Sequence, residues 1–407
     1  MGGKGIVVIG MQYGDEGKGK LVDFLSENAD FVVRYQGGAN AGHTIKIGDK
    51  QVILHQIPSG ILRGKKCIMG RGMVINPITV RDEMKDLEDK GFQVKGNLFI
   101  DPGAHMVLPE QVDGSKSESG TGRGIAPCYA NKAGKKGLRF FDLDVSLDDV
   151  HAFDIAARMN LVKHKEFLNE HKDLLEYVQD GSKLLYYGKE NNYNILFEGA
   201  QGVGLDLDHG QYPEGTSSNP TIGGVMTGSG VSHKFIDMVV GVAKAYVTRV
   251  DANGAGPLTT QLDDGVGEQL REKGGEYGAT TGRPRRCGWF DVPLIKYGVR
   301  INGIDRIFLT KLDVLSGFNE IKICIGYEKD GEDVGFIPDA IKLRKVTPVY
   351  ESLPGWEQDI TGCRSFEELP ENAKRYVNRL MELLGVPIDV SVGPERNQTI
   401  MKDSYWN

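Results

Sequence analysis

The stretch Gly14–Leu21 constrains this chain most, because a glycine-rich turn there joins an apolar run to a predicted helix. Residues Gly5–Gly10 read Gly-Ile-Val-Val-Ile-Gly, which predicts a strand buried on both faces. Beyond the turn, residues 23–25 continue into a helix. Backbone N–H groups and a helix N-terminus face an anion in such an arrangement. The sequence therefore predicts a phosphate-binding loop.

The spacing of this loop matches G-x-x-x-x-G-K, with Gly14, Gly19 and Lys20 at the fixed positions. Leu21 stands where that pattern has Ser or Thr, whose hydroxyl would bind Mg²⁺. We therefore expect Asp15, inside the loop, to hold the metal. Tight packing alone could also explain the turn, but the two lysines of the loop have little structural use without an anion.

Composition excludes several classes of protein. The net charge is −7 and no basic block is present, which argues against a nucleic-acid partner. We expect neither a signal peptide nor a membrane span, since no apolar run approaches ~18 residues. The five cysteines are odd in number, far apart and without metal spacing. Reduced thiols in a cytoplasmic protein are the expectation.

The order of elements indicates an α/β fold. Strands are predicted to alternate with helices, which implies a large, mainly parallel central sheet with helical and loop insertions. No repeat or linker divides the sequence, so we expect one domain over residues 1–407. Ligand loops should lie at the carboxyl ends of the strands. The predicted strands are residues 5–10, 29–35, 52–56, 66–69, 98–101, 193–198, 238–250, 306–310, 321–326 and 388–391.

The loop Asn40-Ala-Gly-His-Thr44 follows the second predicted strand, so it should lie beside the phosphate loop. A histidine in a loop is most often a surface or packing residue. Between glycine and threonine, His43 is better placed to donate to a phosphoryl oxygen in transfer. The carbonyl of Gly42 could approach a metal.

A second anion site is predicted at Gly278-Ala-Thr-Thr-Gly-Arg-Pro-Arg-Arg286. Two hydroxyls and three arginines form a clamp for a carboxylate or a phosphate. A charge run is usually a solvated face, but Thr-Thr-Gly has no purpose on such a face. Gly288-Trp-Phe290 should anchor the loop immediately afterwards.

The segment Thr310-Lys-Leu-Asp313 is similar to the Asn/Thr-Lys-x-Asp motif of guanine nucleotide proteins. In that motif the aspartate accepts hydrogen bonds from guanine, and the lysine stem lies along the ring. Alone the match is weak. Combined with the phosphate loop, it favours GTP over ATP.

Eight motifs together resemble the adenylosuccinate synthetase family, in the order of that family and across essentially the whole chain. They are Gly14-Asp-Glu-Gly-Lys-Gly-Lys20, Asn40-Ala-Gly-His-Thr44, Thr121-Gly-Arg-Gly124, Glu198-Gly-Ala-Gln-Gly202, Thr216-Ser-Ser-Asn219, Thr280-Thr-Gly-Arg283, Lys311-Leu-Asp313 and Ser391-Val-Gly-Pro394. The resemblance implies a homodimer that uses Mg²⁺ and couples GTP hydrolysis to the joining of IMP and L-aspartate.

The resemblance also implies roles for individual residues. Asp15 would take the N1 proton of IMP, and His43 would stabilise the phosphoryl group as O6 attacks it, giving a 6-phosphoryl-IMP intermediate. The aspartate amine would then displace phosphate. The metal would contact Asp15 and Gly42.

The ligand sets implied by the resemblance are larger. GTP would contact Gly14, Glu16, Gly17, Lys18, Gly19, Lys20, Gly42, Thr44, Arg285, Lys311, Leu312, Asp313, Ser391, Val392 and Gly393. IMP would contact Asp15, Lys18, Asn40, Ala41, Gly42, His43, Thr121, Lys135, Gln201, Thr216 and Arg283. Aspartate would contact Ala279, Thr280, Thr281, Gly282, Arg283, Pro284 and Arg285.

Two departures from the family pattern bear on nucleotide preference. Lys135 stands where the family has an arginine that reaches the IMP phosphate of the partner subunit; lysine keeps the charge but not the bidentate fork. The segment Val250-Asp-Ala-Asn-Gly254 carries about three extra residues relative to that pattern. It lies near the ribose in the family.

Two alternatives remain open at this point. A GTP-binding module without ligase activity would explain the phosphate loop and Lys311-Leu-Asp313, but not the arginine loop. A family relative acting on another 6-oxopurine nucleotide, such as a guanylate, would use the same motifs. Asp15 suits the N1 of hypoxanthine and thus favours IMP.

Overall fold

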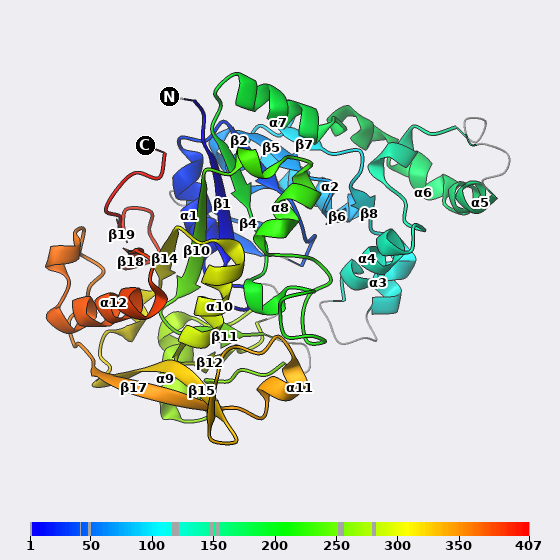
Figure 1. Cartoon of the computed structure of the whole chain (residues 1–407). Coiled ribbons are helices and arrows are strands. Elements are labelled where there is room, and N and C mark those ends of the chain that lie inside the picture. Colours follow the sequence, from blue (N-terminus) through cyan, green and yellow to red (C-terminus); the bar gives the residue numbers. More distant parts are fainter. Residues whose placement is uncertain are drawn as a thin grey trace.

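The computed structural model describes residues 2–40, 42–47, 50–115, 122–146, 150, 155–250, 256–278 and 282–406, and of these only the backbone at 43–47, 50–51 and 155–158. The predicted sites Ala41, Thr121 and 279–281 lie outside the described residues, as does the segment 251–255. One large sheet runs through the centre of the molecule, with helices packed around it (Figure 1).

The central sheet has nine strands, and every neighbouring pair except β18 and β19 is parallel. In spatial order these are β19 (Thr399–Ile400), β18 (Ile388–Ser391), β14 (Arg306–Thr310), β10 (Met238–Lys244), β1 (Gly5–Gly10), β9 (Ile195–Glu198), β2 (Phe31–Arg34), β5 (Lys66–Met69) and β7 (Leu98–Ile100). The predicted parallel α/β sheet is confirmed.

Strand β1 lies at the centre of this sheet and is buried along its whole length. Val7 and Ile9 pack into one hydrophobic cluster, whereas Ile6 and Val8 pack into another on the opposite face. This burial on both faces is the physical reason for the unbroken apolar run in the sequence.

The helices cover both faces of the sheet. Buried side chains of α7 (Gly181–Glu190), α8 (Ile222–Ser229), α10 (Val292–Asn302) and α12 (Glu371–Leu384) lie on one face. Those of α1 (Lys18–Ser26) and α2 (Pro77–Asp89) lie on the other face. The described helices are α1 (Lys18–Ser26), α2 (Pro77–Asp89), α3 (Pro109–Ser115), α4 (Ile125–Ala133), α5 (Ile155–Lys163), α6 (Lys165–Glu170), α7 (Gly181–Glu190), α8 (Ile222–Ser229), α9 (Gly265–Gly274), α10 (Val292–Asn302), α11 (Ala340–Leu343) and α12 (Glu371–Leu384).

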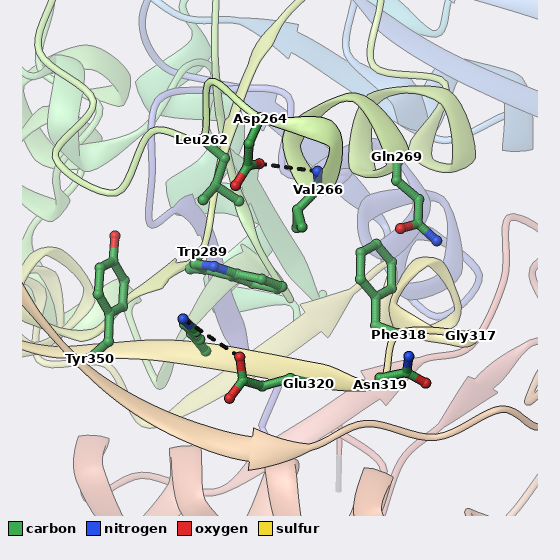
Figure 2. A pocket seen from close by; sticks show the side chains of 11 residues that line it. Leu262, Asp264, Val266, Gln269, Trp289, Gly317, Phe318, Asn319, Glu320 and Tyr350 are labelled. Atoms are coloured by element: carbon green, nitrogen blue, oxygen red, sulfur yellow. Dashed lines mark hydrogen bonds and ion pairs between the residues drawn. The ribbon is translucent and has the colours of Figure 1, made fainter.

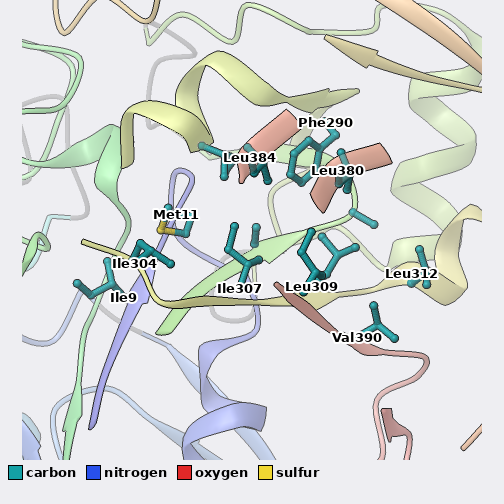
Figure 3. Packing of buried hydrophobic residues seen from close by; sticks show 14 of the residues in the cluster. Ile9, Met11, Phe290, Ile304, Ile307, Leu309, Leu312, Leu380, Leu384 and Val390 are labelled. Carbon is teal, nitrogen blue, oxygen red and sulfur yellow. The ribbon is translucent and has the colours of Figure 1, made fainter. Parts of the chain in front are cut away.

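Figure 3 shows how one of these faces is filled. Leu380 and Leu384 of α12 lie with Phe290 over Ile307 and Leu309 of β14. This packing fixes β14 and therefore the position of the loop that follows it, which carries the predicted guanine motif.

Shorter elements complete the chain. The 3₁₀ helices are η1 (Ser59–Arg63), η2 (Phe140–Leu143), η4 (Lys172–Tyr177), η5 (Val203–Leu205), η6 (His233–Phe235), η7 (Leu312–Leu315) and η8 (Phe366–Glu368). The small sheets pair β3 (His43–Ile47) with β4 (Lys50–Leu54), β6 (Val74–Ile75) with β8 (His105–Met106), β11 (Val247–Arg249) with β12 (Arg286–Gly288), and β13 (Phe290–Asp291), β16 (Glu332–Val334) and β17 (Thr347–Pro354) with β15 (Glu320–Lys329).

Two predicted strands and part of a third do not join the central sheet. The predicted strand 238–250 divides into β10 and β11, and β11 pairs with β12 instead. Residues 321–326 belong to β15, which pairs antiparallel with β17, and residues 52–54 belong to the hairpin of β3 and β4. An apolar pattern predicts a strand but not its partner, so the sequence alone could not separate these strands from the main sheet. All five cysteines are free, as expected. Within the described part of the chain, no helix is long and apolar enough to cross a membrane.

Candidate active site

The phosphate loop lies where predicted, between the end of β1 and the start of α1. Gly14, Asp15 and Gly17 have φ values of 85°, 58° and 86°, in the left-handed region. Aspartate tolerates this region better than most residues other than glycine. The Asp15 side chain is 42% exposed, so its carboxylate is available at the mouth of the loop.

A buried ion pair sets the shape of this loop. The Glu16 carboxylate accepts hydrogen bonds from the backbone N–H groups of Gln12 and Gly14, at 3.0 and 2.9 Å, and lies 2.5 Å from Lys18 Nζ. The Thr310 hydroxyl donates to the Glu16 carbonyl, at 2.5 Å. Glu16 is fully buried and its carboxylate is bonded within the loop, so this side chain is not available to a phosphate.

Both loop lysines have structural partners, so the prediction that they have little structural use without an anion is wrong. Lys18 Nζ bonds Glu16 and also donates to the Gln201 carbonyl, at 2.5 Å. Lys20 Nζ donates to Ser391 Oγ at 2.6 Å and to the Gly393 carbonyl at 2.7 Å. Local sequence could not show these acceptors, because most of them lie far along the chain.

Lys20 connects two predicted GTP-binding segments, the phosphate loop and the Ser391-Val-Gly393 loop that follows β18. Burial lowers the pKa of Lys20 to about 8, while the nearby Asp313 opposes that shift. Ser391 and Val392 are buried, and the Ser391 hydroxyl also donates to the Gly393 carbonyl at 3.0 Å.

The predicted guanine motif begins at the end of β14. Lys311 has a φ of 57°, and its Nζ donates to the Gly274 carbonyl at 2.5 Å and to Glu276 at 3.1 Å. These bonds hold the lysine stem in place. Leu312 is buried, and burial raises the pKa of the partly exposed Asp313.

The arginine loop reaches the phosphate loop through one residue. Arg285 Nε lies 2.9 Å from the Asp15 carboxylate, and Arg285 Nη1 lies 2.7 Å from Glu276. Gly282, Arg283 and Pro284 are exposed, and Gly282 has a φ of 64°.

The third arginine of the loop, Arg286, has a structural role. Arg286 donates to Gln261 at 3.0 Å and to the Gly256 carbonyl at 2.7 Å, so it fixes the base of the loop. Trp289 and Phe290 are buried, which confirms the predicted anchor. Arg286 is thus held at the base of the loop, whereas Arg283 is exposed within it.

Some of the residues predicted for IMP lie in the loops after β2 and β9, among them Asn40 and Gln201. Gln201, with a φ of 55°, has both side-chain amide atoms buried, and neither has a hydrogen-bond partner among the described residues. A Cβ on Gly37 would lie 3.1 Å from Gln201 Oε1, so glycine keeps this space open. A buried amide without partners costs about 1–3 kcal/mol and is the polar group that a nucleotide could satisfy.

For the other residues predicted to bind substrates, the structure gives fewer contacts. Asn40 Oδ1 accepts from Gly38 N–H at 3.1 Å, and the Thr216 N–H donates to the Leu205 carbonyl at 2.7 Å. His43 and Thr44 begin β3, described by its backbone alone. Lys135 is exposed, just beyond the end of α4, with a φ of 58°.

The oxygen ligands around the phosphate loop are suited to a single Mg²⁺ ion that also binds a nucleotide phosphate. No group of three or more His, Cys, Asp or Glu residues that could hold a metal occurs among the residues the structure describes. Mg²⁺ commonly takes only one or two carboxylates, with phosphate oxygens and waters as its other ligands. Asp15 offers such a carboxylate, and the space beside the Gly42 Cα is open.

Sequence analysis missed Glu276, the buried acid that bonds Arg285 and Lys311. The one local feature that could have identified Glu276 is that it is an acidic residue in a glycine-rich segment shortly before three arginines. Its partner Lys244, also fully buried, lies within β10 and was likewise not singled out.

A cavity of about 380 Å³ lies apart from this constellation (Figure 2). Figure 2 shows Trp289 and Phe318 facing the side of α9 that carries Val266 and Gln269. The lining residues are Leu262, Asp264, Val266, Gln269, Trp289, Gly317, Phe318, Asn319, Glu320, Lys322 and Tyr350. None of them was predicted to bind a substrate, and the phosphate loop does not reach this cavity.

Comparison with known proteins gives consistent matches. The adenylosuccinate synthetase family model matches residues 7–400. The chain is 48% identical to the adenylosuccinate synthetases of Geotalea uraniireducens, over 97% of this chain and 98% of that protein, and of Geobacter sulfurreducens, over 97% of each.

Two solved structures are also similar. The fully ligated adenylosuccinate synthetase of Plasmodium falciparum has a TM-score of 0.89 and 39% identity, covering 98% of this chain and 99% of that one. A cyanophage S-2L succinoaminodeoxyadenylate synthetase bound to dGMP and dATP has a TM-score of 0.65 and 20% identity, covering 99% and 97%. At that identity the second likeness concerns the fold alone.

Proposed function

We propose residue roles from the premise that this chain belongs to the adenylosuccinate synthetase family. It is a GTP-dependent ligase that joins IMP and L-aspartate to form adenylosuccinate, a step of purine biosynthesis. The roles rest mainly on one observation, the 2.9 Å contact between Asp15 and Arg285. It brings the phosphate loop and the arginine loop to one point.

In the first step Asp15 accepts the N1 proton of IMP. Electron density moves to O6, which attacks the γ-phosphorus of GTP, and the bond from that phosphorus to the β–γ bridging oxygen breaks to release GDP. The product is 6-phosphoryl-IMP. The exposure of the Asp15 carboxylate and its place at the mouth of the loop support this role.

Charge on the transferred group is stabilised by the loop. Backbone N–H groups of the loop at Glu16, Gly17 and Gly19 and the N-terminus of α1 face the phosphates, and His43 donates to the phosphoryl group. Lys18 lies beside this turn on Glu16 and Gln201, positioned to stabilise charge that develops between the two nucleotides.

In the second step the aspartate amine attacks C6 of the intermediate. The C6–O6 bond breaks, phosphate leaves with O6, and the amine loses a proton. Arg283 and Arg285 hold the aspartate carboxylates together with the Ala279–Gly282 segment and Pro284. The contact of Arg285 with Asp15 supports this placement, because a carboxylate bound there lies close to the first reaction centre.

Guanine is bound between the loop after β14 and the loop after β18. The Asp313 carboxylate accepts from the N1–H and the exocyclic amine, and the stem of Lys311 lies along the ring. Ser391, Val392 and Gly393 close the other side. Two observations support this: Lys311 is held by Gly274 and Glu276, and Lys20 ties the Ser391 loop to the phosphate loop.

IMP occupies the region between the loops after β2 and β9. The free amide of Gln201 and the loop residues Asn40–Gly42 bind the nucleotide, with Thr121 and Thr216 completing the site. Asp15 and the Gly42 carbonyl would hold Mg²⁺, which when bound neutralises charge on the GTP phosphates.

The oligomer and the compartment are also proposals. Two chains form a homodimer, in which Lys135 of one chain reaches the IMP phosphate of the other. Its exposure beyond the end of α4 supports a contact outside its own chain. Five free thiols support a cytoplasmic location.

A coupled assay of phosphate release tests the substrate assignment. GTP or ATP is paired with IMP or dGMP, with and without aspartate. We expect release only with GTP, IMP and aspartate together. Release with dGMP in preference to IMP would favour the guanylate-directed relative, and release from GTP alone would favour a GTPase module.

A further inference from the structure

Glu276 is a buried carboxylate that binds four side chains from separate parts of the chain. Its oxygens lie 2.5 Å from the Tyr246 hydroxyl, 2.7 Å from Arg285 Nη1 and 3.1 Å from the ammonium groups of both Lys244 and Lys311. We call these five residues the Glu276 cluster. They lie on β10, on the loops after β10 and β14, and on the two ends of the arginine loop.

The charges of this cluster keep Glu276 ionised. Burial alone would raise the pKa of its carboxyl, but Lys244, Lys311 and Arg285 hold that pKa well below its usual range. Lys244 and Glu276 are both fully buried. Three cations thus share one buried anion.

Two of these cations point to different parts of the proposed site. Lys311 stands at the guanine motif, and its side chain is 34% exposed. Arg285 continues from Glu276 to Asp15, the proposed general base. One carboxylate therefore holds a group that recognises guanine and a group that reaches the reaction centre.

A purely structural ion pair would not need this arrangement. Lys244 alone could neutralise Glu276, and Tyr246 already donates to the same oxygen as Lys244. The two further cations are instead partly exposed residues of the proposed site, and each is held on Glu276 by an atom of its charged end.

We propose that Glu276 is a positioning residue that fixes Lys311 for guanine and Arg285 for aspartate and Asp15 at once. The inference rests on the roles proposed above for Lys311 and Arg285. It predicts that loss of the Glu276 charge weakens two substrates that do not touch Glu276 and leaves the third nearly unchanged.

The first test is Glu276→Gln, which keeps the shape of the side chain and removes its charge. We expect KM to rise about tenfold for both GTP and aspartate, with KM for IMP within about twofold, because Lys311 and Arg285 are the two residues of the proposed substrate sites that lose a charge-assisted bond to Glu276. Glu272→Gln is the matched control: Glu272 is exposed on α9, where it accepts a hydrogen bond from Tyr277. It should leave all three KM values unchanged.

A charge-balanced variant covers the case in which Glu276→Gln does not fold. The double variant Lys244→Met/Glu276→Gln removes one buried cation with the anion, and replacing a buried ion pair by groups of similar size is often tolerated. The same rise in KM for GTP and aspartate is expected. Melting temperature and circular dichroism establish that each variant is folded.

Double-mutant cycles separate positioning from general destabilisation. In a Lys311→Met background, Glu276→Gln should no longer change KM for GTP but should still raise KM for aspartate. In an Arg285→Leu background the pattern should reverse. A folded Glu276→Gln or double variant with a lower melting temperature and unchanged KM values would overturn the inference.

The single variants distinguish this inference from the proposed function. If Lys311→Met leaves KM for GTP unchanged, or Arg285→Leu leaves KM for aspartate unchanged, the proposed role of that residue fails. If both single variants act as proposed and Glu276→Gln does not, only the positioning role of Glu276 fails.

Discussion

Lys20 Nζ lies 2.6 Å from Ser391 Oγ, although the two residues are 371 positions apart in the chain. The same ammonium group donates to the carbonyls of Gly393 and Gln398, at 2.7 and 2.9 Å. The first turn of α1 is therefore tied to the loop after β18. In the proposed site, these two segments hold the phosphates and the base of one GTP molecule.

Removing this contact should weaken GTP selectively. Lys20→Met takes away three charge-assisted hydrogen bonds, so we expect KM for GTP to rise about tenfold or more at pH 7. KM for IMP should change by less than about twofold. Initial rates with each substrate varied in turn measure both. Equal increases for the three substrates would mean that Lys20 supports the fold in general.

The same lysine predicts a pH dependence. Its folded pKa is lowered to about 8, so in the free enzyme it loses its proton as the pH rises through that value. Phosphate charge favours the protonated form, so GTP binding would take up a proton above this pH. KM for GTP in the wild type should therefore increase from pH 7 to 9, with a smaller increase in Lys20→Met. Parallel profiles would exclude Lys20 as the titrating group.

Asp15 carries the chemical step in the proposed mechanism. Asp15→Asn removes the base and a metal ligand while keeping the size of the side chain. Positioned proton transfer contributes ~10²–10⁴-fold, so kcat should fall at least 100-fold. The melting temperature should change little, since the carboxylate is exposed at the mouth of its loop. Turnover above a tenth of the wild-type value would remove Asp15 from the mechanism.

Arg283 provides a test of aspartate binding outside the Glu276 cluster. Arg283→Leu should raise KM for aspartate about tenfold, because a guanidinium–carboxylate bond is lost. Arg283→Lys should give an intermediate value, since lysine keeps the charge without the planar fork. The comparison requires KM for IMP and GTP in the same variants. A leucine variant that affects GTP most would place this arginine on the phosphates instead.

Base recognition can be tested at Asp313. Asp313→Asn should raise KM for GTP and improve use of xanthosine triphosphate, because an amide can donate to the C2 carbonyl of xanthine where the carboxylate only accepts. Competition between GTP, ITP and XTP in phosphate release measures this preference. An unchanged order of the three nucleotides would show that the motif merely ends strand β14.

Local chemistry explains what could be predicted from the sequence. The apolar run of β1 and the glycines at 14 and 17 both depend on neighbouring residues. These features were predicted at close to their observed positions.

Non-local pairing explains what could not be predicted. Lys244 lies in an otherwise apolar strand, and nothing beside it identifies Glu276, 32 residues away, as its partner. The bond from Glu16 to Lys18 was within reach of local reasoning. The burial of this pair could not be predicted from nearby residues, because residues far along the chain, such as Thr310, pack against it.

The last prediction concerns the proposed dimer. Lys135 is exposed on its own chain, where a solvated lysine would be the ordinary outcome. If it instead reaches the IMP phosphate of the partner subunit, Lys135→Ala should raise KM for IMP several-fold, because a point-charge contact to phosphate is lost. KM for GTP should stay nearly unchanged. Lys136→Ala, at the exposed neighbouring lysine, is the matched control.

Mixing two impaired variants tests whether Lys135 acts across the dimer. Lys135→Ala is combined with Asp15→Asn at subsaturating IMP, where each variant alone has low activity. In a heterodimer one site carries both substitutions and the other carries neither, so subunit exchange should restore activity toward a quarter of the wild-type value at equal amounts. Exchange is followed by energy transfer between labelled chains. If the chains exchange and the activity stays at the sum of the two variants, Lys135 does not act on the partner's site.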